Sequence, residues 1–198
     1  MSLTEVDWSA IPAPEDDGAA AHLEGMALPA VALPATSGGT VDPSRLEGRV
    51  VLYVYPRTGR PGRALPEGWD EIPGARGCTP QTCAFRDHFR ELRAAGADHV
   101  FGLSTQDTEY QREAAARLDL PFPLLSDVDH LFGAALRLPS FEVEGALLWK
   151  RLALIAEAGR IVKVFYPVFP PDRNARDVLD WLTYRQGGGL ALEGISRP

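Results

Sequence analysis

Two cysteines lie five positions apart in one short stretch, and the other 196 of the 198 residues include no further cysteine. Thr79 and Pro80 follow Cys78 directly. Proline is tolerated in the first turn of a helix, where its missing N–H would have no partner. Apolar residues recur at helical spacing as far as Leu92, and Gly96 follows as a stop signal. The sequence therefore predicts a helix of about four turns with Cys78 at its N-terminus.

The spacing of the cysteines restricts how they can bond. Five residues on an ideal helix separate two Cα atoms by ~8.7 Å, whereas a disulfide needs Cα atoms about 4.4 to 6.8 Å apart. A bond between Cys78 and Cys83 therefore requires the first turn to unwind, and helix ends open at little free-energy cost. We expect a thiol form with an intact helix and a disulfide form whose N-terminal end has melted.

The surroundings of Cys78 favour the thiolate, which is the reactive form of cysteine. The partial positive charge of the helix start acts on Cys78, and Arg76 and Arg86 are close in sequence. A second interpretation stays open at this point, because free cysteine is among the most buried residue types and the pair can simply pack beneath a helix. A zinc site is disfavoured, because the four histidines do not stand at the usual ligand spacing to the cysteines.

Charge and hydropathy exclude several classes of partner. The net charge is -7 and the basic residues are scattered among acids, which argues against nucleic acid. No window approaches the ~20 apolar residues of a membrane span, and the acidic segment 1–20 does not resemble an export signal. We therefore expect a cytoplasmic protein with no membrane or nucleic-acid partner. In a reducing compartment the two cysteines favour a reactive role over a structural disulfide.

The order of the remaining patterns predicts one α/β domain over 27–185, with an N-terminal extension over 1–26 and a C-terminal tail over 186–198. Trp8 is a candidate anchor for the extension. The predicted elements are a hairpin over 27–40, a buried strand over 50–55, the cysteine helix, a strand over 99–104, a helix over 107–118, a strand over 122–125, a helix over 128–136, a loop over 138–146, a hairpin over 151–166 and a helix over 172–184. This order, βαβ and then ββα, indicates a thioredoxin-like fold, a central mixed sheet flanked by helices.

The irregular segment 57–76 is too long for an ordinary connection and is predicted to be an insertion that covers or serves the site.

Three motifs occur together along the chain. The block Gly77-Cys78-Thr79-x-Gln81-x-Cys83-x-Phe85-Arg86-Asp87 stands between Tyr55-Pro56 and Phe122-Pro123-Leu124-Leu125-Ser126-Asp127, and Arg151 opens a later strand. Over residues 28–182 the chain thereby resembles the peroxiredoxins, most closely their bacterioferritin-comigratory or peroxiredoxin Q group. The resemblance implies a thioredoxin-fold thiol peroxidase that needs no metal and no organic cofactor.

The resemblance also implies a role for each residue of the motifs. Cys78 matches the peroxidatic cysteine, whose thiolate attacks a peroxide and becomes a sulfenic acid. Cys83 matches a resolving cysteine, which converts that acid into an intramolecular disulfide for reduction by thioredoxin or a similar dithiol. Arg151 matches the arginine that holds the thiolate and polarises the peroxide. Hydrogen peroxide and organic hydroperoxides are the expected substrates, and resolution within one chain leads us to expect a monomer.

The chain departs from the family at two positions near Cys78. The family pattern is Pro-x-x-x-Thr-x-x-Cys, but Ala75 occupies the threonine position and Pro56 lies 22 positions before Cys78. Thr58, close to Pro56, is our candidate for the missing hydroxyl, and a plain turn residue is the competing interpretation. Gln81 stands where many relatives carry glutamate, which removes one negative charge near the site.

Other functions stay open on the sequence alone. A general disulfide oxidoreductase is disfavoured, because such proteins carry their cysteines as Cys-x-x-Cys. A redox sensor or binding module switched by a Cys78–Cys83 disulfide would need only one stoichiometric oxidation, whereas a peroxidase consumes many equivalents of peroxide. The lost threonine also leaves a nonreactive thioredoxin-fold protein as an alternative.

Overall fold

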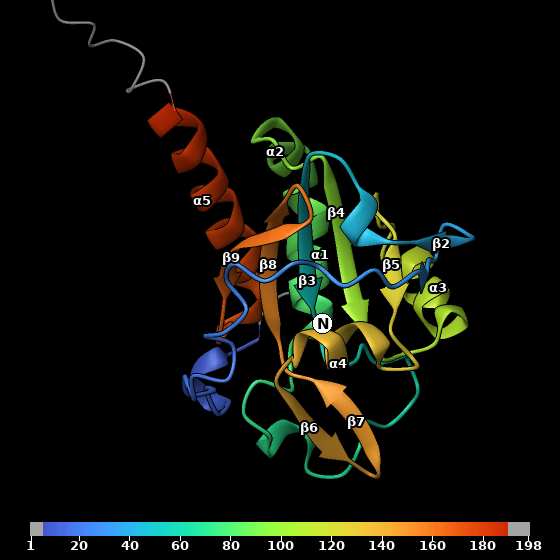
Figure 1. The fold of residues 1–198 in the computed structure, drawn as a ribbon. Coiled ribbons are helices and arrows are strands. Elements are labelled where there is room, and N and C mark those ends of the chain that lie inside the picture. The colour runs from blue at the N-terminus through green and yellow to red at the C-terminus, as the bar shows by residue number, and fades with distance from the viewer. Residues whose placement is uncertain (1–5, 190–198) are drawn as a thin grey trace, which may run out of the picture.

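A five-stranded sheet forms the centre of the molecule (Figure 1). The computed structural model describes residues 6–189. The strand order is β5-β4-β3-β8-β9, with β3 (Arg49–Val54), β4 (His99–Ser104), β5 (Leu124–Ser126), β8 (Leu152–Glu157) and β9 (Arg160–Phe165). The first three strands are parallel, and β8 and β9 each pair antiparallel to their neighbour. The predicted thioredoxin-like fold with a mixed sheet is confirmed.

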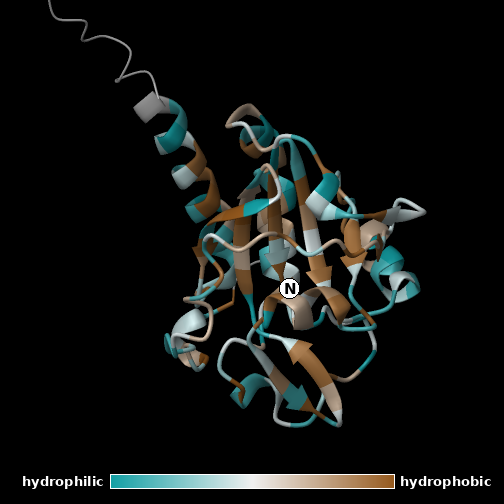
Figure 2. Ribbon diagram, in the orientation of Figure 1, coloured by the Kyte–Doolittle hydropathy of each residue, from teal (hydrophilic) through white to brown (hydrophobic). Residues whose placement is uncertain are grey.

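Strand β3 occupies the middle of the sheet because its side chains are apolar on both faces. Val51 pairs with Val100 of β4 on one side and with Ile155 of β8 on the other. Successive residues of a strand point to opposite faces, so Leu52 enters one hydrophobic cluster and Tyr53 enters the other. In Figure 2 the strands of the central sheet are mostly coloured as hydrophobic, as a sheet covered on both faces requires.

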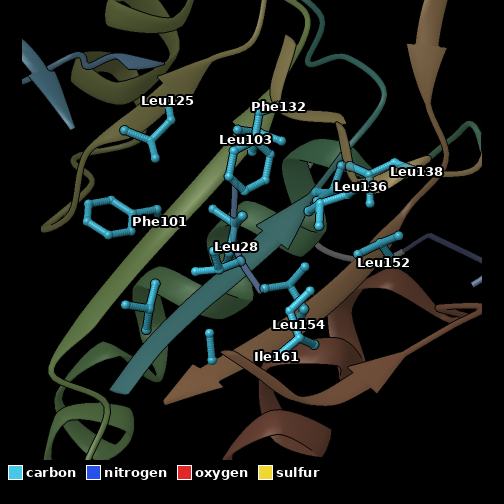
Figure 3. Close-up of a cluster of buried hydrophobic side chains, with 14 of the residues drawn as sticks. Leu28, Phe101, Leu103, Leu125, Phe132, Leu136, Leu138, Leu152, Leu154 and Ile161 are labelled. Carbon is cyan, nitrogen blue, oxygen red and sulfur yellow. The ribbon is translucent and has the colours of Figure 1, made fainter. Parts of the chain in front are cut away.

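The first cluster fills the space between the sheet, α4 (Leu131–Leu136) and the N-terminal segment. Figure 3 shows Leu28 of this segment among the leucines of the strands and of α4. Leu23 is also fully buried, so part of the predicted extension belongs to the core. Trp8, in a 3-10 turn over Trp8–Ala10, donates its indole N–H to Asp172 at 2.9 Å. Trp8 is thus an anchor, as predicted.

The second cluster lies on the opposite face of the sheet, beneath α1 (Cys78–Asp87) and α5 (Asn174–Gly189). Phe85 of α1 stacks on Tyr53 with ring centroids 4.3 Å apart. Ala175, Val178 and Leu182 of α5 complete this layer. Cys78 belongs to the same cluster, so the candidate reactive sulfur is held by the packing of the domain.

Several predicted boundaries need correction. The cysteine helix is not one continuous helix, because it breaks at His88 and continues as α2 (Phe89–Ala94). The final helix follows a 3-10 turn over Pro171–Arg173 and runs to Gly189, so the glycine run at 187–189 does not begin the tail. Residues 190–198 of the predicted tail lie outside the described residues. The predicted loop over 138–146 instead contributes to a hairpin of β6 (Ser140–Val143) and β7 (Ala146–Trp149).

The remaining elements follow their sequence signals. The predicted early hairpin is confirmed as β1 (Leu33–Pro34) paired with β2 (Thr40–Val41), and a 3-10 turn over Pro43–Arg45 follows it. Helix α3 (Thr108–Arg117) starts after Asp107, whose carboxylate accepts a hydrogen bond from the N–H of Tyr110 at 2.7 Å. Within residues 6–189, none of the helices has the length and apolar character needed to cross a membrane.

Candidate active site

Gly77 sets the position of Cys78 at the start of α1. The Gly77 backbone has φ +105°, in the left-handed region, and a Cβ atom there would lie 2.5 Å from Pro171 and 2.9 Å from the Trp8 ring. Only glycine meets both conditions without strain. The anchored N-terminal segment and the turn before α5 therefore close directly on the start of the cysteine helix.

Cys78 is a free thiol and is nearly enclosed, with 4% of its surface exposed. Its Sγ atom donates to the carbonyl oxygen of Ala75 at 3.6 Å. Ala75 is fully buried and occupies the threonine position of the family pattern. At this position the chain has no side-chain hydroxyl, and the backbone carbonyl accepts a hydrogen bond from the Cys78 thiol.

Arg151, immediately before β8, is the cation at the sulfur. It is 3% exposed, and its Nη2 atom lies 3.4 Å from Cys78 Sγ. The same nitrogen reaches the carbonyl oxygens of Gly74, Ala75 and Arg76 at 3.0 to 3.2 Å. Within residues 6–189 no carboxylate forms an ion pair with Arg151. A buried guanidinium held only by neutral acceptors stabilises a negative charge on the neighbouring sulfur.

Gln81 connects this arginine to the last helix. The side-chain oxygen of Gln81 accepts a hydrogen bond from Arg151 Nη1, and its amide nitrogen donates to Asn174 Oδ1 at 2.9 Å. Gln81 and Asn174 are both buried. A glutamine can donate and accept at once, so the neutral side chain orients the guanidinium without neutralising its charge.

Two buried tyrosines, Tyr53 and Tyr55, belong to the same hydrophobic cluster as Cys78. The hydroxyl of Tyr53 donates to Thr82 of α1 at 3.3 Å, and Tyr55 accepts from Gln111 at 3.4 Å. Burial raises the pKa of both phenols above the ordinary value. Both rings therefore stay neutral and place no negative charge beside Cys78 at physiological pH.

Cys83 is half-buried and is also a free thiol. Burial raises the pKa of the Cys83 thiol, and the nearby Arg86 guanidinium offsets part of this effect. Cys83 is therefore mainly protonated at neutral pH. Of the two sulfurs, only Cys78 has a hydrogen bond from an arginine among the described residues.

Pro56 and Thr58, the two residues after β3 that the motifs suggest as supporting residues of the site, form no hydrogen bond with the Cys78 sulfur among the described residues. Pro56 is buried just after β3. Thr58 is fully buried, and its hydroxyl donates to Gln106 Oε1 at 3.1 Å. In this conformation the Thr58 hydroxyl is bonded to Gln106, and not to the Cys78 sulfur as our hypothesis would require. Its role at the site stays a prediction.

The insertion over 57–76 forms one wall of a pocket beside Cys78. The pocket has a volume of about 450 Å³ and is also lined by Thr79 and Pro80 of α1. A 3-10 turn over Trp69–Glu71 lies within the insertion, and Trp69 packs in a small apolar cluster with Leu148 of β7. The β6-β7 hairpin, visible at the bottom of Figure 1, thus supports the wall from below.

Sequence reasoning missed the contribution of Asn174 and Tyr53 to this site. Asn174 is 93 positions from Gln81, and no local pattern predicts such a contact. Tyr53 was expected only as a residue of a buried strand.

Among the described residues, no group of three or more histidine, cysteine or acidic side chains is arranged to hold a metal ion.

Comparison with known proteins gives the class of this site. The Redoxin family matches residues 23–179. Peroxiredoxin Q, chloroplastic, from Suaeda salsa is 31% identical over 80% of the chain and 67% of its own length, and the Populus jackii protein is 30% identical over the same shares. The Triticum aestivum relative is 31% identical over 64% of its length, so the chain spans about two thirds of the length of these relatives. The chain therefore belongs to the redoxin family.

Solved structures agree with this assignment. Peroxidoxin BcpB from Mycobacterium tuberculosis has 25% identity and a TM-score of 0.66, covering 81% of this chain and 96% of its own. The bacterioferritin comigratory protein of Xanthomonas campestris has the same fold at 22% identity, with a TM-score of 0.65 and coverage of 82% and 99%. Within the redoxins, the relatives place the chain among the peroxiredoxins of the peroxiredoxin Q group. It is a peroxiredoxin enzyme with the thiol peroxidase activity of its class.

Proposed function

We propose that the chain reduces hydrogen peroxide and organic hydroperoxides through a sulfenic acid on Cys78, which Cys83 resolves as an intramolecular disulfide. Thioredoxin or a similar dithiol completes the cycle. The observation that carries the proposal is the contact between Arg151 Nη2 and Cys78 Sγ at 3.4 Å. Peroxidase chemistry needs a thiolate with a fixed cationic donor beside it, and Arg151 is such a donor at the Cys78 sulfur.

In the first step, the Cys78 thiolate attacks one oxygen of the peroxide. An S–O bond forms and the O–O bond breaks, and the leaving hydroxide or alkoxide takes up a proton to become water or an alcohol. Negative charge moves from sulfur to the leaving oxygen during this step. Arg151, held by three carbonyls and Gln81, stays in place while the charge moves, which is the electrostatic preorganisation that lowers such barriers.

In the second step, Cys83 Sγ attacks the sulfur of the Cys78 sulfenic acid. The S–O bond breaks, a disulfide forms, and the oxygen leaves as water. Both cysteines lie in α1, so the first turn of α1 must unwind before the sulfurs can meet. The dithiol reductant then restores both thiols and becomes a disulfide itself.

Sustained turnover tests the proposal. Reduced protein is mixed with hydrogen peroxide, thioredoxin, thioredoxin reductase and NADPH, and the consumption of NADPH is followed. We expect many turnovers in the wild type and none in Cys78→Ser. Cys83→Ser should use one equivalent of peroxide to form the sulfenic acid and further peroxide as that acid is overoxidised, without sustained consumption of NADPH. A wild type that stops after one equivalent would contradict the peroxidase cycle and favour a redox sensor.

We also propose a cytoplasmic location and a monomeric enzyme. The location follows from the reactive use of both cysteines, which suits a reducing compartment. The monomer follows from resolution within one chain. Gel filtration of the reduced and the oxidised protein tests the second proposal, which a stable dimer in either state would contradict.

A further inference from the structure

Five arginines line the pocket beside Cys78, although the chain as a whole carries a net charge of -7. Four come from the insertion and one from the end of α3, and they are Arg57, Arg60, Arg63, Arg76 and Arg117. The described residues that line the pocket include no acidic side chain. Positive charge is therefore concentrated at the entrance to the reactive sulfur.

The acidic neighbours of these arginines do not cancel this charge. Glu113 pairs with Arg117 at 2.7 Å and lies 3.6 Å from Arg60, and Asp70 pairs with Arg76. Two carboxylates thus face three guanidinium groups. Arg57 and Arg63 form no ion pair within residues 6–189. The pocket keeps an excess of positive charge that an anionic ligand can use.

Part of this cluster is held in place. The Arg60 guanidinium lies over the Tyr110 ring, 4.0 Å from its centroid. Arg117 donates to the Gly59 carbonyl oxygen at 3.1 Å and to Glu113. Arginines fixed in this way lose little conformational entropy when they bind a ligand.

The same pocket has an apolar side. Trp69 is buried there, and Leu65 lines the entrance with 43% of its surface exposed. Hydrogen peroxide is too small to contact either the apolar side or most of the arginines of a cavity of about 450 Å³. The geometry points to a longer substrate, with its peroxide at Cys78, a hydrocarbon portion near Leu65 and an anionic group at the arginines.

We propose that the insertion of this chain makes it selective for organic hydroperoxides that carry a carboxylate. A carboxylate matches the forked donors of a guanidinium group, and the apolar side of the pocket suits the carbon chain between the two ends. This proposal rests on the proposed peroxidase function and adds a charge selectivity to it. Arg57 and Arg63, which have no ion pair among the described residues, supply the attraction.

A matched pair of substrates tests the selectivity. The probes are a tertiary hydroperoxide with a carboxylate and the methyl ester of the same compound, which differ in charge. Each kcat/KM is divided by the rate with free dithiothreitol, which removes the intrinsic difference in reactivity. We expect the wild type to prefer the acid roughly tenfold or more, and the preference to shrink as ionic strength rises.

Charge-neutral variants locate the effect. The double variant Arg57→Gln/Arg63→Gln should bring the acid-to-ester ratio close to one. Arg90→Gln removes an exposed arginine of α2 that does not line the pocket, and it should keep the wild-type ratio. Equal rates for acid and ester in the wild type, or a preference that survives in the double variant, would overturn the inference. If the wild type does not turn over hydrogen peroxide at all, the proposed peroxidase function is wrong. The failure of the proposed function is thereby distinguishable from the failure of the proposed selectivity.

Discussion

Arg151 Nη2 lies 3.4 Å from Cys78 Sγ, although 73 positions separate the two residues in the sequence. The arginine is buried, hydrogen-bonded to neutral oxygens, and free of carboxylate partners among residues 6–189. The charge that best complements it inside the domain is therefore a thiolate on Cys78. This relationship connects the fold to the chemistry, because α1 brings the sulfur and the strand after Arg151 brings the cation to one side of the sheet.

Gly77→Ala should destabilise the protein strongly. The alanine would adopt a left-handed backbone and its Cβ would meet Pro171 at 2.5 Å. We expect a loss of about 2–4 kcal/mol in the free energy of unfolding, measured by denaturant titration. Gly145→Ala is the matched control, because Gly145 also has positive φ but has open space at its Cβ. The control should lose about 1 kcal/mol, and equal losses in both variants would contradict the predicted clash.

Gln81→Leu should slow the attack of Cys78 on peroxide roughly tenfold, because Arg151 loses an acceptor that orients it. Unpaired Asn174 should also cost about 1–3 kcal/mol of stability. The measurement is the rate of sulfenic acid formation in a Cys83→Ser background. Gln81→Glu restores an acceptor for Arg151 but adds a negative charge beside the guanidinium, so it should recover only part of the rate. If Gln81→Leu reacts as fast as the parent, Gln81 does not position the arginine.

Thr58→Val tests the hypothesis that Thr58 supplies the hydroxyl missing at Ala75. The hydroxyl donates to Gln106, so we expect the variant to lose about 1 kcal/mol of stability. If the hydroxyl keeps this partner during the reaction, the rate of the variant with hydrogen peroxide should stay within about twofold of the wild-type rate. A large loss of rate without unfolding, by contrast, would mean that the hydroxyl moves to the sulfur during the reaction.

The reactivity of Cys83 should depend on pH in a defined direction. Burial raises the pKa of its thiol above the ordinary value of 9.0, with Arg86 partly offsetting the shift. Iodoacetamide reacts with the thiolate. The rate of alkylation of Cys83 in Cys78→Ser should therefore be low at pH 7 and should increase with pH, with a midpoint above 9.0. Because the raised pKa favours the protonated thiol in the folded state, this contribution to stability is full at neutral pH and is lost as the pH rises through the folded pKa.

Arg86→Gln should move this alkylation midpoint to still higher pH, because the variant removes the largest opposing influence on Cys83. Arg90→Gln on α2 is the control and should leave the midpoint unchanged. A midpoint at or below the value of an unfolded thiol would show that burial does not govern Cys83.

The local parts of this account could be predicted from the sequence. Pro80 and the pattern after it placed Cys78 at a helix start, and the apolar run over 50–55 placed β3 in the sheet. These predictions succeeded because the signals are carried by neighbouring residues. The break at His88 has no glycine or proline nearby to signal it, so a continuous helix was the natural expectation.

The contacts between distant segments could not be read from local patterns. Arg151 entered the prediction only through the family resemblance, and Asn174 did not enter at all. The β6-β7 hairpin was missed because its strands are four residues long and the turn at Glu144 and Gly145 is its main signal. The charged pocket likewise depends on how the insertion folds back beside α3, which spacing alone does not determine.

The most direct test of the central claim is the rate of Cys78 oxidation with and without Arg151. Reduced Cys83→Ser protein and the same protein with Arg151→Met are mixed with hydrogen peroxide, and the sulfenic acid is trapped and quantified over time. Thermal unfolding of both proteins confirms that they are folded at the assay temperature. We predict that loss of the guanidinium slows the reaction about 100- to 1000-fold. Equal rates in the two proteins would contradict the claim that the contact between Arg151 and Cys78 activates the sulfur.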